Sequence, residues 1–235
     1  MTVQDILSEL AQMGNESTKK IFMRHGAKEP IYGVKVGDLK TIQKIIKKDY
    51  QLALDLYATG NSDTMYLAGL IADEKKMTKV DLQRWMEQAT WYMLSEYTVA
   101  WITAESRFGA ELAREWIESP NEKIASGGWS TWSNVVAIKP DNELNINELS
   151  FLLDRVQRDI HSTQNRVRYT MNGFVIAVGS YVAALTDKAF SVADAIGNVS
   201  VDVGNTACKI PLASDYLDKI MAMNKIGKKK KMARC

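Results

Sequence analysis

The segment DLKTIQKIIKKDYQLALDLYATG, residues 38–60, decides the fold class. Its first half predicts a helix over residues 38–49 whose apolar side chains share one face: Leu39, Ile42, Ile45 and Ile46. The lysines between them fall towards the opposite, solvent-facing side. The second half predicts another helix over residues 49–60, closed by Gly60. Two helices joined by a short turn are therefore the structural unit to look for elsewhere in the chain.

Helical patterning continues on both sides of this segment. Thr2 and Asp5 resemble a capping box before a first helix. The stretch STKKIFMRHG predicts a second helix, with Ser17 as its N-cap and Gly26 as its stop. Further helices are expected at about 62–73, 78–89, 91–104, 107–118, 122–138, 145–160, 165–184, 186–196 and 213–223. The strand-like stretch NVSVDVGN (198–205) is short and flanked by glycine, so we interpret it as a loop.

This pattern predicts an all-α protein. Pairs of helices recur every 30–45 residues, which is typical of a HEAT-like α-solenoid of antiparallel helix pairs, curved with a concave groove. A compact all-α bundle is the alternative, because sequence similarity between the repeats is weak. We expect one domain over residues 1–223, followed by a basic tail at 224–235.

The composition favours a globular protein. The chain has 235 residues, of which 46% are hydrophobic and 25% charged. No apolar run approaches the roughly 18 residues that a membrane span needs, and the first residues lack the features of a secretory signal. We therefore expect a cytoplasmic protein. Its two cysteines, Cys208 and Cys235, should be reduced, with Cys208 partly buried, and no metal or cofactor site is expected.

Charge is distributed unevenly along the chain. Six of its 30 basic residues lie in residues 224–235, NKIGKKKKMARC, so the rest carries 24 basic and 28 acidic side chains. An acidic body does not attract phosphate as a whole. The tail is then either a solvated terminus or a sequence-independent phosphate clamp that includes Lys228, Lys229, Lys230 and Lys231.

Aromatic residues gather in two places, TWYMLSEYTVAWITAES (90–106) and GGWSTWSN (127–134). Tyr97, Trp129 and Trp132 are candidates for stacking on nucleic-acid bases, although aromatic rings also pack well in cores. The pair Gly127-Gly128 is unusual in a helical pattern. Either a helix begins after it or another backbone approaches closely.

The segment 162–185 predicts a long helix that begins with polar and basic residues: Arg166, Arg168, Tyr169 and Asn172. A helix start with arginines can hold a phosphate through its free N–H groups. The alternative is a solvated start with a buried asparagine that hydrogen-bonds a neighbour. No nucleophile triad and no phosphate-binding loop is evident, and Glu96 and Glu105 are the candidate acids near the aromatics.

Four stretches resemble the bacterial DNA alkylation repair family of the AlkD type. They are YGVKVGDLKTIQKIIKKD (32–49), REWIESPNEKIASGG (114–128), NRVRYTMNGFVIAVGSYV (165–182) and TACKIPLASDYLDKIMAMNKIGKKKKMARC (206–235). The resemblance implies a HEAT-like solenoid whose concave face cradles duplex DNA. Active members are metal-independent glycosylases that excise N3- and N7-alkylated purines. Their site has two tryptophans, an arginine and an aspartate that stabilises the developing sugar cation.

Those site residues do not carry over to this sequence. The first tryptophan position falls on Glu96, the aspartate on Ala100, the arginine near Ser126 and the second tryptophan near Gly173. We therefore interpret the chain as a divergent branch without the usual aspartate. The leading hypothesis is a DNA-binding protein with weak, altered or absent glycosylase activity. The alternatives are an active glycosylase rebuilt around Glu96 with Tyr97, and a scaffold for a protein partner; oligomeric state stays open.

Overall fold

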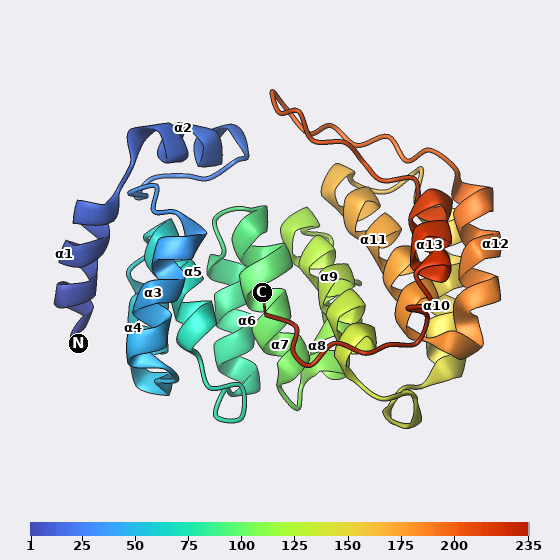
Figure 1. The fold of residues 1–235 in the computed structure, drawn as a ribbon, viewed down its shortest axis with the longest axis horizontal. Coiled ribbons are helices and arrows are strands. Elements are labelled where there is room, and N and C mark those ends of the chain that lie inside the picture. Colours follow the sequence, from blue (N-terminus) through green and yellow to red (C-terminus); the bar gives the residue numbers. More distant parts are fainter. Residues whose placement is uncertain (235) are drawn as a thin grey trace. The chain divides into compact units, whose positions relative to one another are not determined.

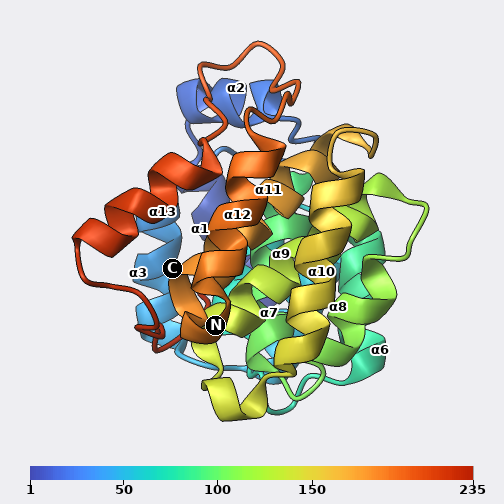
Figure 2. The same ribbon diagram turned by 90° about the vertical axis from the view of Figure 1, so that its right-hand side faces the viewer.

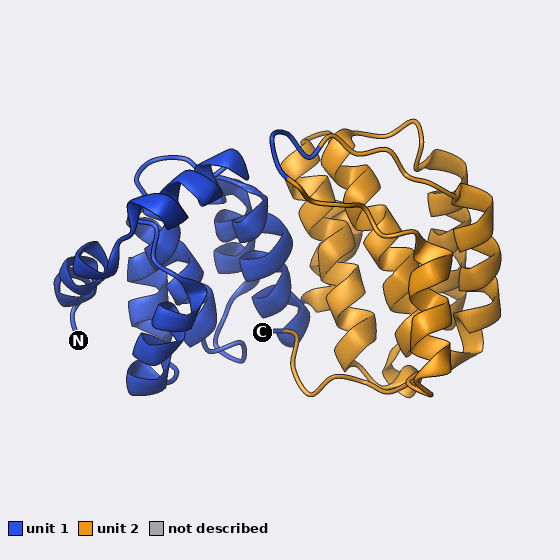
Figure 3. Ribbon diagram, turned by 45° about the horizontal axis from the view of Figure 1, so that its top comes forward, with its two compact units in different colours: residues 1–108, 203–206, 234 blue, residues 109–202, 207–233, 235 orange. Residues whose placement is uncertain are grey.

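The computed structural model describes residues 1–234, and within that range it is helical with no β-strand. The prediction of an all-α fold is confirmed. The chain divides into two compact units (Figure 3). Unit 1 comprises Met1–Phe108, Val203–Thr206 and Arg234, and unit 2 comprises Gly109–Asp202 and Ala207–Ala233. The concave groove stays an expectation, because it depends on how the two units are placed. Whether they act as one domain also stays a prediction.

Unit 1 contains seven α-helices and one π-helical segment. They are α1 (Val3–Met13), α2 (Glu16–Arg24), α3 (Val36–Ile46), α4 (Tyr50–Ala58), α5 (Ser62–Ile71), α6 (Lys79–Gln88), the π-helix η1 (Met93–Val99) and α7 (Ala100–Glu105). The capping box at Thr2 and Asp5 is confirmed, and Gly60 follows α4 with a positive φ of 71°. These signals end and begin helices where the sequence predicted them.

Helix α5 forms the centre of unit 1. Every one of its ten residues is buried, and it packs against α1, α3, α4 and η1; Figure 1 shows α3, α4 and α5 side by side. Its buried Asp63 accepts hydrogen bonds from the backbone N–H groups of Tyr32, Gly33 and Val34, at 2.6, 3.1 and 3.0 Å. Burial raises the pKa of this carboxyl group, against the effect of those three donors. Asp63 thus fixes the extended connection before α3.

A second polar contact in unit 1 joins two buried aromatic residues. The ring of Tyr57 on α4 stacks on that of Trp85 on α6, with centroids 4.1 Å apart. The Tyr57 hydroxyl donates to the Trp85 carbonyl oxygen at 2.7 Å. Burial raises the pKa of this hydroxyl well above its usual value, so it remains protonated and keeps donating.

Unit 2 contains six α-helices and two short 3-10 helices. They are α8 (Gly109–Trp116), α9 (Glu122–Ile138), η2 (Asp141–Glu143), α10 (Ile146–Asp159), α11 (Asn165–Tyr181), η3 (Ala183–Leu185), α12 (Thr186–Ile196) and α13 (Ala213–Ala222). Helix α11 is central, and it packs against α9, α10, α12 and α13. Figure 2 shows α10 and α12 side by side, with α11 behind them.

The glycine pair at 127–128 lies inside α9, which continues through it without interruption. A Cβ atom on Gly128 would lie 2.7 Å from the backbone nitrogen of Ile117 and 2.9 Å from Cβ of Trp116. Of the two interpretations of this pair, the close approach of another backbone is therefore correct. It lets α8 and α9 pack tightly.

Several local predictions were wrong. Ile45 is 68% exposed, because the buried stripe of α3 runs through Leu39 and Ile42, and Ile45 lies about a third of a turn from it. The N-cap of α2 is Asn15, whose side chain accepts from the Thr18 N–H at 2.9 Å, and not Ser17. The helix expected over 91–104 contains a π-helical segment, which apolar spacing cannot reveal.

No single helix in residues 1–234 is long and apolar enough to cross a membrane. Helix α11 and the segment Ala183–Ile196 pass that test only as a pair, and they are bent by 117°. Residues 198–205 form the predicted loop.

Candidate nucleic-acid interface

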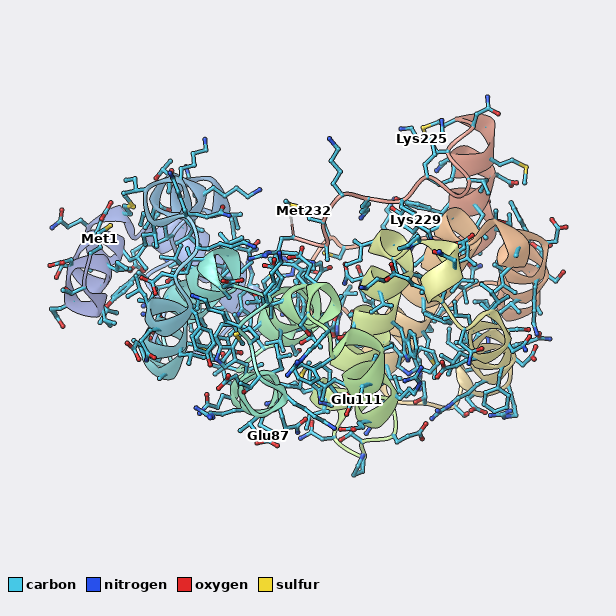
Figure 4. All side chains as sticks on the ribbon, turned by 90° about the horizontal axis from the view of Figure 1, so that it is seen from below. Met1, Glu87, Glu111, Lys225, Lys229 and Met232 are labelled. Atoms are coloured by element: carbon cyan, nitrogen blue, oxygen red, sulfur yellow. The ribbon has the colours of Figure 1, made fainter. Side chains whose placement is uncertain are left out.

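The basic segment 225–231 is ordered on unit 2. Gly227 donates its N–H to the Ser180 carbonyl at 2.8 Å, and Lys230 donates its N–H to the Ala137 carbonyl at 2.8 Å. The Lys229 ammonium bonds the Val136 carbonyl at 2.9 Å and Asp141 at 2.8 Å. Figure 4 shows Lys225 beside the end of α13 and Lys229 further along the tail. Contacts within unit 2 thus hold this lysine segment in place, instead of leaving it as a free terminus.

The lysines of this segment have two different roles in the structure. Lys229 is 19% exposed and anchors the segment through Asp141. Lys228, Lys230 and Lys231 are exposed, and the Lys230 ammonium lies 5.6 Å from the centre of the Tyr181 ring. Because the backbone is already fixed, a contact with an anion costs only the ordering of the lysine side chains, which suits a phosphate contact.

Arg234 belongs to unit 1, where it is buried in an ion cluster. Its guanidinium, 8% exposed, bonds Glu105 at 2.6 Å and Glu74 at 2.7 Å. It also donates to the Ala72 carbonyl at 2.9 Å, and its backbone N–H donates to Glu105 at 3.0 Å. The end of α5, where the last backbone carbonyls have no partner within the helix and the helix dipole is negative, therefore holds a cation. Arg234 is not available for a phosphate, unlike the exposed lysines.

Glu74 is held in its charged form by this cluster and by Lys48. Burial alone would raise its pKa, but the hydrogen bond from Lys48 and the charges of Arg234 and Lys48 lower the pKa below its usual value of 4.5. The cluster of Arg234, Glu105 and Glu74 is a feature that the sequence analysis missed.

The candidate tryptophans lie in the core of unit 2. Trp129 is fully buried, with its ring edge-on to Phe174 at 5.2 Å, and Trp132 is also buried. The guanidinium of Arg114 lies 5.4 Å from the Trp132 ring centre, and that of Arg155 lies 5.8 Å from the Trp129 ring centre. In these positions both rings pack helices together and present no open face to a base. This is the core-packing role that was the alternative to base stacking.

Glu96 and Tyr97 lie together in η1 of unit 1. Glu96 is buried, while Tyr97 is partly exposed, with its ring edge-on to Trp101 at 5.8 Å. The π-helix passes close to α5, since a Cβ atom on Gly69 would lie 2.3 Å from the Thr98 side chain. π-helical turns occur frequently at functional sites, and a buried carboxylate on one is a candidate catalytic acid.

The start of α11 is engaged by other groups of unit 2. The backbone N–H of Arg166 donates to the Glu122 carboxylate at 2.7 Å, so a carboxylate already lies at this helix terminus. The Arg166 guanidinium lies 4.4 Å from the Tyr169 ring centre. Arg168 donates to the Thr163 carbonyl at 2.8 Å. A phosphate at this terminus would compete with Glu122.

Asn172 is the buried asparagine that hydrogen-bonds a neighbour, which was the alternative to phosphate binding. It is buried, and its side-chain amide donates to the Pro211 carbonyl at 2.9 Å. Of the other positions expected to match the family's site residues, Ala100 and Ser126 are buried, and Gly173 has open space around its Cα. Cys208 is exposed and not partly buried as expected, because it lies in the loop before α13. The possible pairing of Cys208 with Cys235 lies outside the described residues.

The candidate residues are thus divided between the units. Glu96 and Tyr97 belong to unit 1, and all the other candidates belong to unit 2: Trp129, Trp132, Arg166, Arg168, Asn172, Lys228, Lys229, Lys230 and Lys231. Their convergence on one site therefore stays a prediction. Among residues 1–234, no group of three or more His, Cys, Asp or Glu side chains is placed to hold a metal ion.

Comparison with known proteins defines the class. The fold matches, with a TM-score of 0.92 and 38% identity over 100% of both chains, a solved structure described as "a new family of proteins related to the HEAT-like repeat DNA glycosylases with affinity for branched DNA structures". The protein therefore has the HEAT-like helical fold that was predicted.

Sequence comparison gives the family. The model of the DNA alkylation repair enzyme family matches residues 6–217, and the chain belongs to that family. Two uncharacterised proteins are similar along nearly their whole length. Lin0241 of Listeria innocua is 34% identical over 97% of this chain and 100% of its own, and Lmo0209 of Listeria monocytogenes is 35% identical over 93% and 97%.

Proposed function

We propose that this protein binds DNA, with branched DNA as its preferred form. The observation that carries the proposal is the ordered lysine segment of unit 2, which presents the exposed amines of Lys228, Lys230 and Lys231 on a chain whose remainder is net acidic. The affinity for branched DNA of the family to which the similar solved structure belongs supports the choice of substrate.

The chemistry of such binding is contact with the sugar–phosphate backbone. Each lysine that meets a phosphate releases a condensed counterion, so affinity falls as salt rises. Contacts of this kind carry no base specificity, and they fit a protein that recognises the form of the DNA and not its sequence. We infer that glycosylase chemistry is weak, altered or absent, because the resemblance to the family puts its aspartate at the position of Ala100.

The test measures affinity against salt concentration for the wild type and for a variant with Lys228, Lys230 and Lys231 all changed to Ala. Probes are a linear duplex and a four-way junction of equal length. Three lost phosphate contacts should flatten the slope of log affinity against log salt by about 2.7 on duplex. A control with the exposed lysines Lys44, Lys75 and Lys76 changed to Ala has the same net charge and should keep the wild-type slope.

Two results would contradict the proposal. Equal slopes in the tail variant and the control would mean that the lysine segment does not contact phosphate. No binding of either DNA by the wild type at low salt would remove the DNA-binding function itself, and would favour the scaffold for a protein partner.

A second candidate function, base excision, is supported by one observation. Glu96 is a buried carboxylate on a π-helical turn beside the partly exposed Tyr97. A carboxylate near the sugar lowers the barrier to cleavage of an alkylated purine, which is already a good leaving group. The assay is release of N7-methylguanine or N3-methyladenine from alkylated DNA by the wild type and by Glu96→Gln. Release that the Glu96→Gln variant loses would support this function, and equal release would refute the role of Glu96.

A further inference from the structure

Helix α2 of unit 1 is unusual because none of its nine residues is buried. Lys20 and Arg24 lie one turn apart on its outer face. Ile21 and Met23 flank them on either side of that face, and these two apolar side chains are 42% and 45% exposed. A basic stripe bordered by exposed apolar groups contributes little to the core of unit 1.

The helix is nevertheless held firmly. The N–H of Asn15 donates to the Tyr32 carbonyl at 3.2 Å. A Cβ atom on Gly33 would lie 2.6 Å from the backbone nitrogen of Lys19, so the connection before α3 touches the helix directly. That connection is the one fixed by Asp63.

The other end of α2 is fixed by aromatic contacts. The ring of Phe22 lies 5.7 Å from that of Trp91, and the hydroxyl of Tyr92 lies 2.8 Å from Nδ1 of His25. The inner side of α2 therefore consists of directed contacts, and its outer side is left to solvent. A surface that is both exposed and fixed is pre-organised for a partner.

Charge on α2 identifies the chemistry of that partner. Lys19 pairs with Glu29 at 2.7 Å, and this contact raises the pKa of Lys19 and lowers that of Glu29. Lys20 and Arg24 make no ion pair within the described part of the chain. Two cations without an ion pair at one-turn spacing favour a polyanion, and the exposed apolar groups beside them favour a polyanion with open apolar faces.

We propose that α2 contacts DNA at a branch point, with Lys20 and Arg24 on backbone phosphates and Ile21 and Met23 against base faces that the branch leaves unstacked. This inference rests on the proposed function and adds to it a surface that distinguishes branched from linear DNA. Base pairs in a linear duplex are stacked on both sides, whereas those at a junction can expose a face. Apolar side chains cover such faces in proteins that kink or open DNA.

The experiment compares two double variants for binding to a four-way junction and to a linear duplex of equal length. Lys20→Ala with Arg24→Ala should flatten the salt slope on the junction by about 1.8, the value for two phosphate contacts. Ile21→Gln with Met23→Gln should keep the duplex affinity and reduce the preference for the junction by about fivefold or more, because the exposed base faces lose their apolar contact. Lys75→Ala with Lys76→Ala is the charge-matched control in unit 1 and should match the wild type.

The result that would overturn the inference is an unchanged junction preference in the Ile21/Met23 variant, or a salt slope for the Lys20/Arg24 variant equal to that of the control. Because no residue of α2 is buried, the variants should keep the wild-type melting temperature, and a circular dichroism melt verifies this. If the wild type binds the junction and the α2 variants behave as it does, only this inference fails. If the wild type binds no DNA, the proposed function fails with it.

Discussion

Replacing Arg234 with Ala should strongly destabilise unit 1. The substitution leaves two carboxylates without their shared cation, on Glu105 and Glu74, whose side chains are 9% and 14% exposed. Removing one partner of a buried ion pair costs about 3–5 kcal/mol, because the remaining charge stays desolvated. For a chain of 235 residues that melts in one transition, each kcal/mol lowers the melting temperature by about 2–4 °C. Taking the lower cost, we expect a fall of about 6–12 °C by circular dichroism.

Two further variants isolate the cause of that effect. Arg234→Lys keeps the charge but cannot reach two carboxylates and the Ala72 carbonyl with a planar donor group, so an intermediate melting temperature is expected. Lys231→Ala removes the same charge from an exposed position three residues earlier and should change stability by about 0.5 kcal/mol or less. A melting temperature for Arg234→Ala that equals that of Lys231→Ala would refute the reasoning, because the cluster would then contribute nothing.

Three more predictions concern single side chains. Gly128→Ala should cost about 1–3 kcal/mol of unfolding free energy in a denaturant melt, because the added Cβ would meet the Ile117 nitrogen. Gly173→Ala, which has open space around it, should be neutral or stabilising. Equal effects of the two substitutions would contradict the close packing at Gly128. Because the pKa of Glu74 is lowered in the folded state, this group contributes stability above pH 4.5, and that stability is lost as the pH falls through the lower folded pKa. Between pH 6 and 3 the melting temperature of the wild type should therefore depend on pH more steeply than that of Glu74→Gln. Parallel curves for the two proteins would exclude Glu74 as the cause. Tyr57→Phe removes a buried donor, but the Trp85 carbonyl still accepts from the Ala89 N–H, so the substitution should cost about 0.5–1.5 kcal/mol; an unchanged melt would show that the hydroxyl adds nothing.

Much of the fold was predictable because its signals are local. Capping residues such as Thr2 and periodic apolar residues such as Leu39 and Ile42 act over one or two helical turns, so the sequence contains them directly. The π-helical turn at Glu96 was not predictable, since it depends on how the backbone packs against Gly69 of another helix.

The candidate site was less predictable, because burial is a property of the folded chain. Trp129 and Trp132 have the spacing of a shared surface, but both rings face neighbouring helices of unit 2. The lysine segment was recognisable from its charge, whereas its anchoring by Lys229 to Asp141 was not. The one-turn spacing of Lys20 and Arg24 can be read in the sequence, but their exposure, which makes them candidates for binding, is known only from the structure.

The ion cluster in unit 1 has a consequence for the order of events during synthesis. Arg234 follows Glu105 by 129 residues and Glu74 by 160. Chains generally begin to fold from the N-terminal side as they emerge from the ribosome, so the helices of unit 1 emerge long before their cation. Until then Glu105 lacks the cation that pairs with it in the finished structure, and Glu74 has only Lys48. Most of unit 1 is therefore made before unit 2, but its ion cluster is completed only after unit 2 has been made.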